Sequence, residues 1–324
     1  MGNGGTNKNM VLLIKNKKGI FLTSLALIMI SIFLLSYTMS NVIQERKTIE
    51  KRISTMNSFL TSTEEDASRQ LYIFGYRMIF VWEDEILKNG SYVTNLNSSL
   101  EEGFFNGTYR NTTNQFINDT RFSDLNNSIN TNAKKVGVKI NLSNPRIIIT
   151  QDDPWNVKIT LISNFTMEDL GNLASWNKTS IISAYIPIQN FEDPIYVINT
   201  NARITHKFMK TPYSPLVSGT DVSNLSSHVD NSYYIANSAS PSFLDRLQGN
   251  LSAANPNGIE SFVNLEKLTV QGIPIKDKSC VDFIYFSDTN PGKYSVSGLP
   301  AWFRIDDQSN RLAFYNLTSL ATPS

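Results

Sequence analysis

The feature that most constrains this chain is an apolar run of twenty residues, 20–39, near its beginning. The run contains no charged residue and follows Lys15, Lys17 and Lys18. At a rise of 1.5 Å per residue, twenty helical residues span about 30 Å, the thickness of the hydrocarbon core of a bilayer. The run therefore predicts a transmembrane helix, preceded by a basic segment over residues 1–19.

The lysines before the run also predict its orientation. Positively charged residues flanking a membrane helix favour the cytoplasmic side, so the N-terminus is expected inside and the C-terminal domain outside. A cleaved secretory signal is the alternative. The run is longer than the apolar part of such a signal, however, and no A-x-A cleavage site follows it. We therefore expect a single-pass protein of the cell membrane with an extracellular domain.

The residues directly before the apolar run form a short motif, Lys17-Lys18-Gly19, followed at once by Ile20. This arrangement resembles the class III signal of type IV pilins and archaeal pilin-like proteins. The resemblance implies that a prepilin peptidase cuts between Gly19 and Ile20 on the cytoplasmic side. It also implies that the apolar helix then serves as the core of a filament or as a membrane anchor.

The resemblance covers about residues 15–60 and has one departure. Bacterial pilins carry glutamate at the fifth position after the cut, where this chain has Ser24. The resemblance therefore implies a minor or simply anchored pilin-like protein. Its implied partners are the membrane and other pilin-like subunits, which would contact the helix over residues 20–60.

The charge of the chain argues against a nucleic-acid partner. The net charge is +1, but residues 1–19 hold four lysines and no acid, which leaves 25 Lys and Arg against 28 Asp and Glu in the remainder. A protein that binds nucleic acid usually carries a basic patch. The single cysteine, Cys280, permits no intrachain disulfide, unlike the disulfide-rich small domains of many secreted proteins.

N-x-S/T sequons are frequent, and all of them follow residue 88. Twelve asparagines begin one: Asn89, Asn97, Asn106, Asn111, Asn118, Asn126, Asn141, Asn164, Asn177, Asn224, Asn250 and Asn316. One interpretation is that a chain rich in Asn, Ser and Thr contains sequons by accident. The other is a glycosylated surface on the outer side of the membrane, as in a glycoprotein. Many sequons with a single cysteine favour an archaeal surface protein.

Residues 40–134 predict helices that continue from the membrane. Apolar residues recur every three or four positions over 43–60 and again over 67–86. Residues 61–64, Thr-Ser-Thr-Glu, predict an interruption and a new cap between these two stretches. Residues 89–134 predict one or two amphipathic helices.

The stretch 67–86 predicts the central helix of the extracellular domain. Leu71, Phe74 and Met78 lie on one face, and a second face carries Tyr72, Ile73, Ile79, Phe80 and Val81. A helix that is apolar on most sides is expected to be buried on most sides.

Residues 135–324 predict a β-rich extracellular domain. Strict alternation of apolar residues over 136–142 is typical of a half-buried strand, and Asn144-Pro145 predicts the turn after it. Further strand candidates are 146–150, 157–161, 181–188, 195–198, 232–236, 268–271, 280–286 and 312–317, and 243–247 is a candidate short helix. The expected class is α+β: a transmembrane helix, a long helical segment, then an antiparallel β-rich ectodomain.

One set of residues resembles an enzyme site. Cys280 with His206 or His228 and Arg304 or Arg311 is similar to the Cys–His–Arg set of sortases, which are anchored, outward-facing transpeptidases. That chemistry needs a thiolate beside an imidazole and a cationic oxyanion helper. The residues before the cysteine do not match the sortase motif, and a lone cysteine in an apolar segment is more often a small core residue.

Two patterns could bind a ligand. Residues 306–310, Asp-Asp-Gln-Ser-Asn, place oxygen atoms at the spacing that begins a calcium loop, although an Asx-rich turn explains them more simply. Trp155, Trp176 and Trp302 could form a platform on which a sugar stacks, but core packing is the simpler interpretation.

These observations predict a non-enzymatic, pilin-like cell-surface protein with a structural or adhesive role and with no cofactor and no metal site. The first alternative is an anchored ectodomain that recognises a glycan or calcium. The second is a Cys-dependent, sortase-like transpeptidase.

Overall fold

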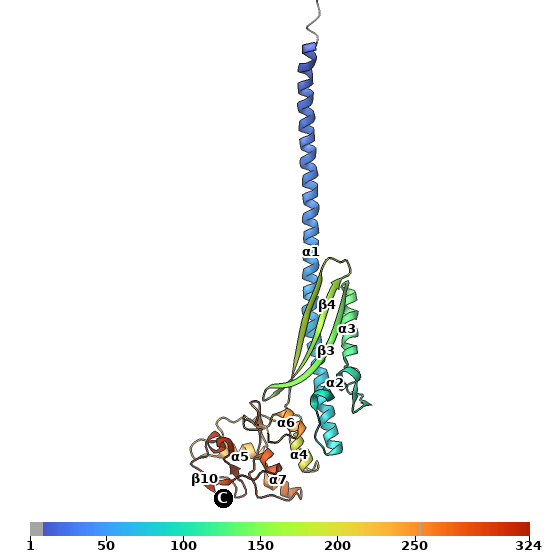
Figure 1. Ribbon diagram of the computed structural model, residues 1–324. Coiled ribbons are helices and arrows are strands. Elements are labelled where there is room, and N and C mark those ends of the chain that lie inside the picture. Colours follow the sequence, from blue (N-terminus) through green and yellow to red (C-terminus); the bar gives the residue numbers. More distant parts are fainter. Residues whose placement is uncertain (1–8, 253) are drawn as a thin grey trace, which may run out of the picture.

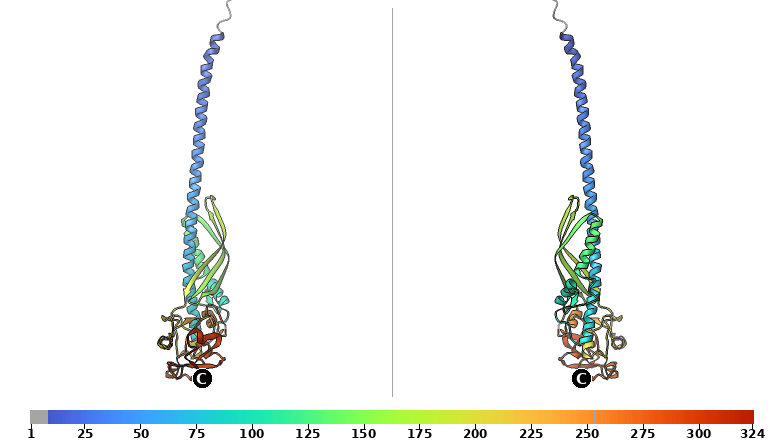
Figure 2. Two further views of the ribbon diagram at one scale, coloured as in Figure 1. Left: turned by 90° about the vertical axis from the view of Figure 1, so that its left-hand side faces the viewer. Right: turned by 90° about the vertical axis from the view of Figure 1, so that its right-hand side faces the viewer.

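The computed structural model describes residues 9–252 and 254–324, with side chains from Gly19 onward (Figure 1). A single helix, α1 (Asn9–Asn89), extends far beyond the remainder of the chain. We call the packed part from residue 52 onward the head. Every residue from 19 to 51 is exposed, and Met56 is the first fully buried residue of the helix. Figure 2 shows from two further directions that only the N-terminal part of the helix stands clear of the head, whereas its C-terminal part runs along the sheet.

The predicted interruption at residues 61–64 is wrong, because α1 continues through it. The Thr63 hydroxyl donates 2.8 Å to the Phe59 carbonyl within the helix instead of capping a new one. Thr63 is buried between Leu60 and Ala67 on the face that packs against the head. Tertiary packing of this face therefore overrides the local capping preference.

Helix α1 packs on a three-stranded antiparallel sheet. The strands β3 (Val138–Asp153), β4 (Asn156–Asp169) and β5 (Ser175–Pro187) lie in the order β3-β4-β5. These strands confirm the predicted alternation. The turn predicted at Asn144-Pro145 is instead an irregularity within β3, where the register with β4 shifts between Ser143 and Arg146.

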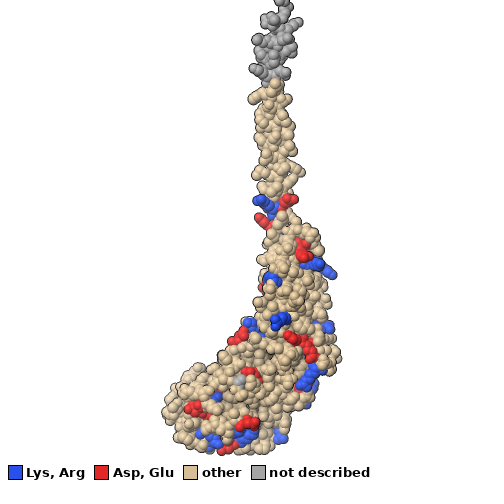
Figure 3. All heavy atoms as spheres, in the orientation of Figure 1, with Lys and Arg blue, Asp and Glu red and all other residues tan. Residues whose placement is uncertain are grey.

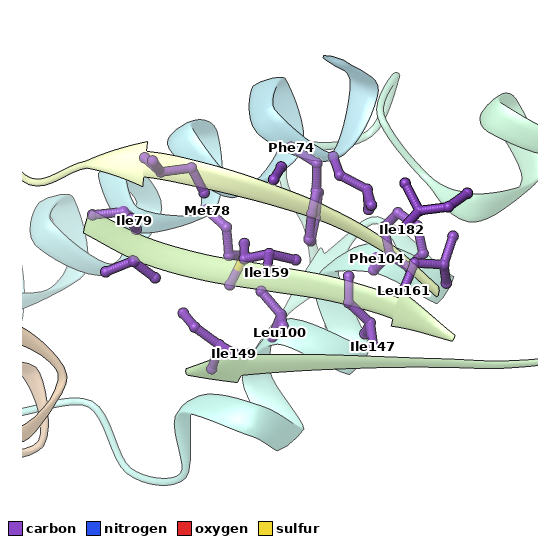
Figure 4. Close-up of a cluster of buried hydrophobic side chains, with 14 of the residues drawn as sticks. Phe74, Met78, Ile79, Leu100, Phe104, Ile147, Ile149, Ile159, Leu161 and Ile182 are labelled. Atoms are coloured by element: carbon purple, nitrogen blue, oxygen red, sulfur yellow. The ribbon is translucent and has the colours of Figure 1, made fainter. Parts of the chain in front are cut away.

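The core between helix and sheet is built from large aliphatic and aromatic side chains (Figure 4). Phe74 and Met78 of α1 are fully buried, as is Ile159 of β4. At Gly75 the helix comes so close that an added Cβ would overlap the Cδ1 atoms of Ile159 and Ile186. The glycine therefore permits the close contact between helix and sheet.

Helices α2 (Leu96–Asn106) and α3 (Phe122–Lys135) pack against β3 and confirm the two amphipathic helices. Gly107 ends α2 in the left-handed conformation. A short hairpin of β1 (Thr108–Tyr109) and β2 (Thr112–Thr113) follows it. The prediction that α1 is buried on most sides is wrong on one face, because Tyr72, Ile73 and Phe80 remain exposed.

Residues 188–324 form what we call the distal lobe, at the end of the head away from the N-terminus (Figure 1). Its elements are short: α4 (Pro194–Asn199), α5 (Ser223–Asp230), β6 (Ile235–Ala236), α6 (Phe243–Gln248), β7 (Ile259–Glu260), α7 (Leu265–Val270), α8 (Asp282–Phe286), β8 (Lys293–Val296), β9 (Ile305–Asp306), η1 (Gln308–Asn310), α9 (Arg311–Phe314) and β10 (Ala321–Pro323). The sheets β10-β8-β9 and β6-β7 are antiparallel.

Several strand predictions in the distal lobe are wrong. The candidates 195–198, 268–271, 280–286 and 312–317 lie largely in the helices α4, α7, α8 and α9, and only residues 235–236 of the candidate 232–236 form a strand. Short apolar runs cannot be distinguished from buried helical turns by periodicity. The short helix predicted at 243–247 is confirmed as α6. The chain is therefore a mixed helix and sheet protein with a long apolar N-terminal helix and antiparallel sheets.

Candidate functional site

The apolar part of α1 is the first candidate site. It is long and apolar enough to cross a membrane. None of the residues in its most hydrophobic stretch of eighteen is buried against the rest of the chain. A core helix of similar composition would be mostly buried. In Figure 3 this part of the helix is free of charge until a cluster of acidic and basic residues just before the head. Such a continuous apolar surface marks a contact with lipid or protein.

The predicted processing signal lies at the start of this surface. The backbone of Lys17 and Lys18 is helical, but their side chains lie outside the described part of the chain. Gly19 and Ile20 are exposed, and a Cβ added at Gly19 would meet no atom within 4 Å. The Thr23 hydroxyl lies 3.0 Å from the Gly19 carbonyl and 2.9 Å from the Ile20 carbonyl, both of which can accept its proton. The peptide bond between them is thus accessible and helical.

The sequon asparagines are on the surface of the head. Ten of the twelve are exposed: Asn89, Asn97, Asn106, Asn111, Asn118, Asn141, Asn164, Asn177, Asn250 and Asn316. Asn126 and Asn224 are half-buried. The side chains of Asn97 and Asn224 are also engaged, since the first accepts from the Ile149 amide and the second donates to the Pro215 carbonyl.

Three sequons share the outer face of the sheet, the face turned away from α1. Asn141 of β3 pairs with Thr166 of β4, which pairs with Asn177 of β5. Thr166 completes the sequon of Asn164, its neighbour two residues away on the same face. The three potential attachment sites therefore lie within one small area, at the end of the sheet nearer to the exposed apolar part of α1.

The structure does not bring the sortase-like set together. Cys280 is fully buried, its sulfur accepts from the Arg304 amide at 3.4 Å, and burial raises its pKa to about 12. The Arg304 guanidinium donates to the carbonyls of Ala301 and Phe303 rather than approaching the thiol. A thiol with this pKa is protonated near neutral pH and is a poor nucleophile.

Neither histidine is hydrogen-bonded to Cys280 in the described part of the chain. His206 stacks on Tyr196 with ring centres 4.0 Å apart, and its Nδ1 lies 2.6 Å from the Tyr234 hydroxyl. His228 contacts the edge of Phe262 and has no hydrogen-bond partner within the described part of the chain. Burial lowers the pKa of His206 to about 3 and that of His228 to about 4. Both imidazoles are therefore neutral at physiological pH.

The carboxylates of the calcium-like segment, residues 306–310, bind other groups of the same chain. Asp306 is buried, pairs with Arg311 and accepts from the Ser279 hydroxyl at 2.6 Å. Asp307 accepts from the Leu312 amide at 3.0 Å. Across residues 9–252 and 254–324, no cluster of three or more His, Cys, Asp or Glu is arranged to hold a metal ion. The segment is thus an Asx-rich turn that positions α9.

The tryptophans do not form one platform. Trp155 precedes the first residue of β4, whereas Trp176 pairs with Met167 near the other end of that strand. Trp155 and Met167 are twelve positions apart along the chain, which is about 40 Å of strand. Trp302 lies in the distal lobe, where its indole donates to Glu266 at 2.8 Å.

Two buried ionic clusters were missed by sequence reasoning. Arg246 is inaccessible to solvent and lies between Asp193 at 2.6 Å and Asp282 at 2.8 Å, while the Tyr234 hydroxyl donates to Asp193. Burial raises the pKa of Asp282 above its ordinary value, although the neighbouring Arg246 guanidinium opposes this shift. The three charges lie on α6, before α4 and at the start of α8, so the cluster ties together elements that are too short to be stable alone.

The second cluster joins Arg311 to Glu260 at 3.3 Å and to Asp306, with the Tyr315 hydroxyl donating to Glu260 at 2.6 Å. The charged residues of both clusters are buried, although Arg311 also lines an open cavity of about 490 Å³. No spacing in the sequence marks these residues, because each acid and base looks like an ordinary surface charge in a polar segment.

The distal lobe has an open groove of about 550 Å³. Its polar lining includes Arg203, Asp230, Glu266 and Lys267, and Val270 stands exposed beside them. The mixed charges and the exposed apolar residue could contact a polar ligand such as a glycan.

Comparisons with family models, with curated proteins and with solved structures found no significant match.

Proposed function

We propose that the chain is a single-pass cell-surface protein, pilin-like in its signal and helix, that holds its head outside the membrane in a structural or adhesive role. The observation that carries this proposal is the continuity of α1. One unbroken helix joins an exposed apolar stretch of membrane-spanning length to the buried core of the head.

The segment between the apolar run and the head supports this arrangement. Residues 40–51 are helical and exposed, and twelve helical residues span about 18 Å. At the upper edge of the head, Arg52 donates to Asp169 at 2.5 Å and to the Gly137 carbonyl at 2.6 Å. These contacts fix the sheet to α1 at a defined distance from the apolar run. Such an arrangement would hold the head away from the membrane surface.

The distribution of sequons supports an outward head. All twelve fall on the head, none is fully buried, and the helix before residue 89 has none. A head facing the cytoplasm would leave these sites without a role. Ser24 in place of the bacterial glutamate favours an anchored or minor subunit over the main subunit of a filament.

Fractionation of cells that produce the full-length chain tests this function. We expect the protein in the membrane fraction and the head to be digested when protease is added to intact cells. The double variant Leu27→Arg with Ile30→Arg should leave the membrane, since each central arginine opposes insertion by about 2.5–3.5 kcal/mol. The matched control, Leu170→Arg with Leu173→Arg in the exposed turn between β4 and β5, should remain. A wild-type chain that is soluble, or a head protected in intact cells, would refute the proposal.

A second candidate function, recognition of a glycan by the anchored head, rests on the groove in the distal lobe. The groove lies at the end of the head away from the apolar helix, where a surface ligand would be met first. Binding of a glycan library by wild type, lost in Arg203→Ala and retained in the remote control Arg146→Ala, would support it.

A further inference from the structure

The outer surface of α1 carries an apolar strip that the head leaves uncovered. Its residues are between 39% and 47% exposed: Tyr72, Ile73, Tyr76, Phe80 and Leu87. We call these five residues the helix strip. Because a helix turns by 100° per residue, the strip lies opposite the face formed by Leu71, Phe74 and Met78, which packs on the sheet.

The spacing of the strip is that of a helix-packing seam. Ile73, Tyr76, Phe80 and Leu87 follow one another at intervals of three, four and seven residues. These intervals bring side chains to one line of an α-helix and are typical of a surface that packs against another helix. Large aromatic residues also contribute most to the stability of protein interfaces.

The head borders the strip without covering it. The ring of Phe191 lies 5.1 Å from that of Tyr76 on one side, and the ring of Phe116 lies 5.6 Å from that of Phe80 on the other. Phe116 is itself 56% exposed and widens the apolar surface.

Three basic residues near the strip are paired within the chain. Arg69 pairs with Asp66, Arg77 with Asp119 at 2.5 Å, and Lys88 with Asp84 at 2.5 Å. Two copies can therefore approach each other without opposing these three basic residues as unpaired like charges.

We infer the partner that binds the helix strip from the proposed membrane anchoring. The choice of a second copy of the chain as this partner therefore rests on the proposed function. Two copies inserted in one membrane by the same unbroken helix have parallel helices, with identical residues at equal height. The strip of one copy then faces the strip of the other, as in an interface with twofold symmetry. The sheet is on the opposite side of α1 and does not obstruct the approach.

We propose that the helix strip is the interface of a parallel homodimer, in which α1 of one copy packs against α1 of a second copy in the same membrane. Residues on the twofold axis, such as Tyr76, contact their own counterparts. The sheets and their sequons face outward from the pair.

Cysteine cross-linking of the full-length chain in cell membranes tests the dimer. The native thiol of Cys280 is fully buried, so it provides a silent background. Tyr76→Cys should form a disulfide-linked dimer on addition of an oxidant, several-fold more than Ile181→Cys. Ile181 is the control because it is 67% exposed on the outer face of the sheet, away from the strip. Adding Phe80→Glu to Tyr76→Cys should lower the cross-linked fraction to the level of the control.

Equal cross-linking of Tyr76→Cys and Ile181→Cys would overturn the dimer. The same membranes, treated with protease from outside, separate the two proposals. If the head is digested and Tyr76→Cys does not cross-link, only the dimer is refuted. If the chain is absent from the membranes, the anchoring itself is refuted.

Discussion

His228 and Glu83 are buried residues whose pKa values shift in opposite senses for the same reason. Burial disfavours the charged form of each side chain, which lowers the pKa of His228 to about 4 and raises that of Glu83 to about 9. Both residues are therefore neutral in the folded chain over most of the physiological range. Unfolding exposes them and restores their ordinary pKa values, so each makes the stability of the head depend on pH.

His228 should make the head less stable in mild acid. Between about pH 4 and 6.5 the unfolded imidazole binds a proton that the folded one does not, so stability falls as the pH decreases through this window. We expect His228→Leu to raise the thermal midpoint of the detergent-solubilised chain more at pH 5 than at pH 8. An equal change at both pH values would contradict the buried, neutral state of this residue.

Glu83 should make the head less stable in mild base. Its Oε1 accepts from the Glu192 amide at 2.9 Å where α1 meets the distal lobe. Between about pH 4.5 and 9 the unfolded carboxyl has released a proton that the folded one retains, so stability decreases as pH rises, by up to about 1.4 kcal/mol per pH unit.

Glu83→Gln tests this, because the amide can accept the same hydrogen bond but does not titrate. From pH 7 to 8.5, where the histidines are neutral in both states, the variant should lose less unfolding free energy than wild type. Asp84→Asn, on the exposed face of the same helix turn, is the control and should follow wild type. Parallel pH profiles for Glu83→Gln and wild type would disprove the raised pKa.

At the scale of single residues, the sequence identified the candidate reactive and ligating residues but not the residues with which each of them pairs in the fold. Cys280 was correctly expected to be a small core residue. The pairing of Arg246 with Asp193 and Asp282 joins positions 53 and 36 residues apart. No local pattern encodes such pairs, because they are specified by how α4, α6 and α8 pack.

Among the elements, α1 has the largest role, because it is at once the apolar surface and the central helix of the head. Its close contact with the sheet depends on Gly75, where a methyl group would overlap Ile159 and Ile186. Both isoleucines are fully buried and have little room to move.

Gly75→Ala should therefore lower the unfolding free energy by about 1–3 kcal/mol, as measured by denaturation of the solubilised chain. The matched control is Gly103→Ala in α2. There an added Cβ would lie 2.8 Å from the sulfur of the buried but flexible Met78 side chain and 3.2 Å from Cδ1 of Ile117, which are milder overlaps than the two at 2.3 Å for Gly75, and alanine improves helix propensity. If Gly103→Ala is as destabilising as Gly75→Ala, the close contact between α1 and the sheet is not what requires the glycine.

The elements were predicted well where one face is buried over a long distance. The strands β3, β4 and β5 alternate over 13 to 16 residues, and the core face of α1 repeats over many turns. In the distal lobe the helices α4, α7, α8 and α9 have four to six residues. Their caps gave a signal that could have been used, since Asp193 before Pro194 and Asn264 before Leu265 both cap helices.

At the scale of the whole molecule, the sequons predict where sugars are attached. In the proposed topology, the outer face of the head is on the side of the membrane where glycosylation would occur. Mass spectrometry of peptides from the native protein should find glycans on exposed sequons such as Asn164 and Asn177. Asn177→Gln should remove one site and leave the others modified. Twelve unmodified sequons would favour their origin in composition alone.

We propose that the chain is cut after Gly19 and then retained in the membrane by the helix that begins at Ile20. The most direct test is mass spectrometry of the mature N-terminus of the protein isolated from membranes. We expect the first residue to be Ile20. A chain that begins at residue 1 or 2 would contradict the pilin-like signal, and a chain that begins after residue 39 would contradict the anchor itself.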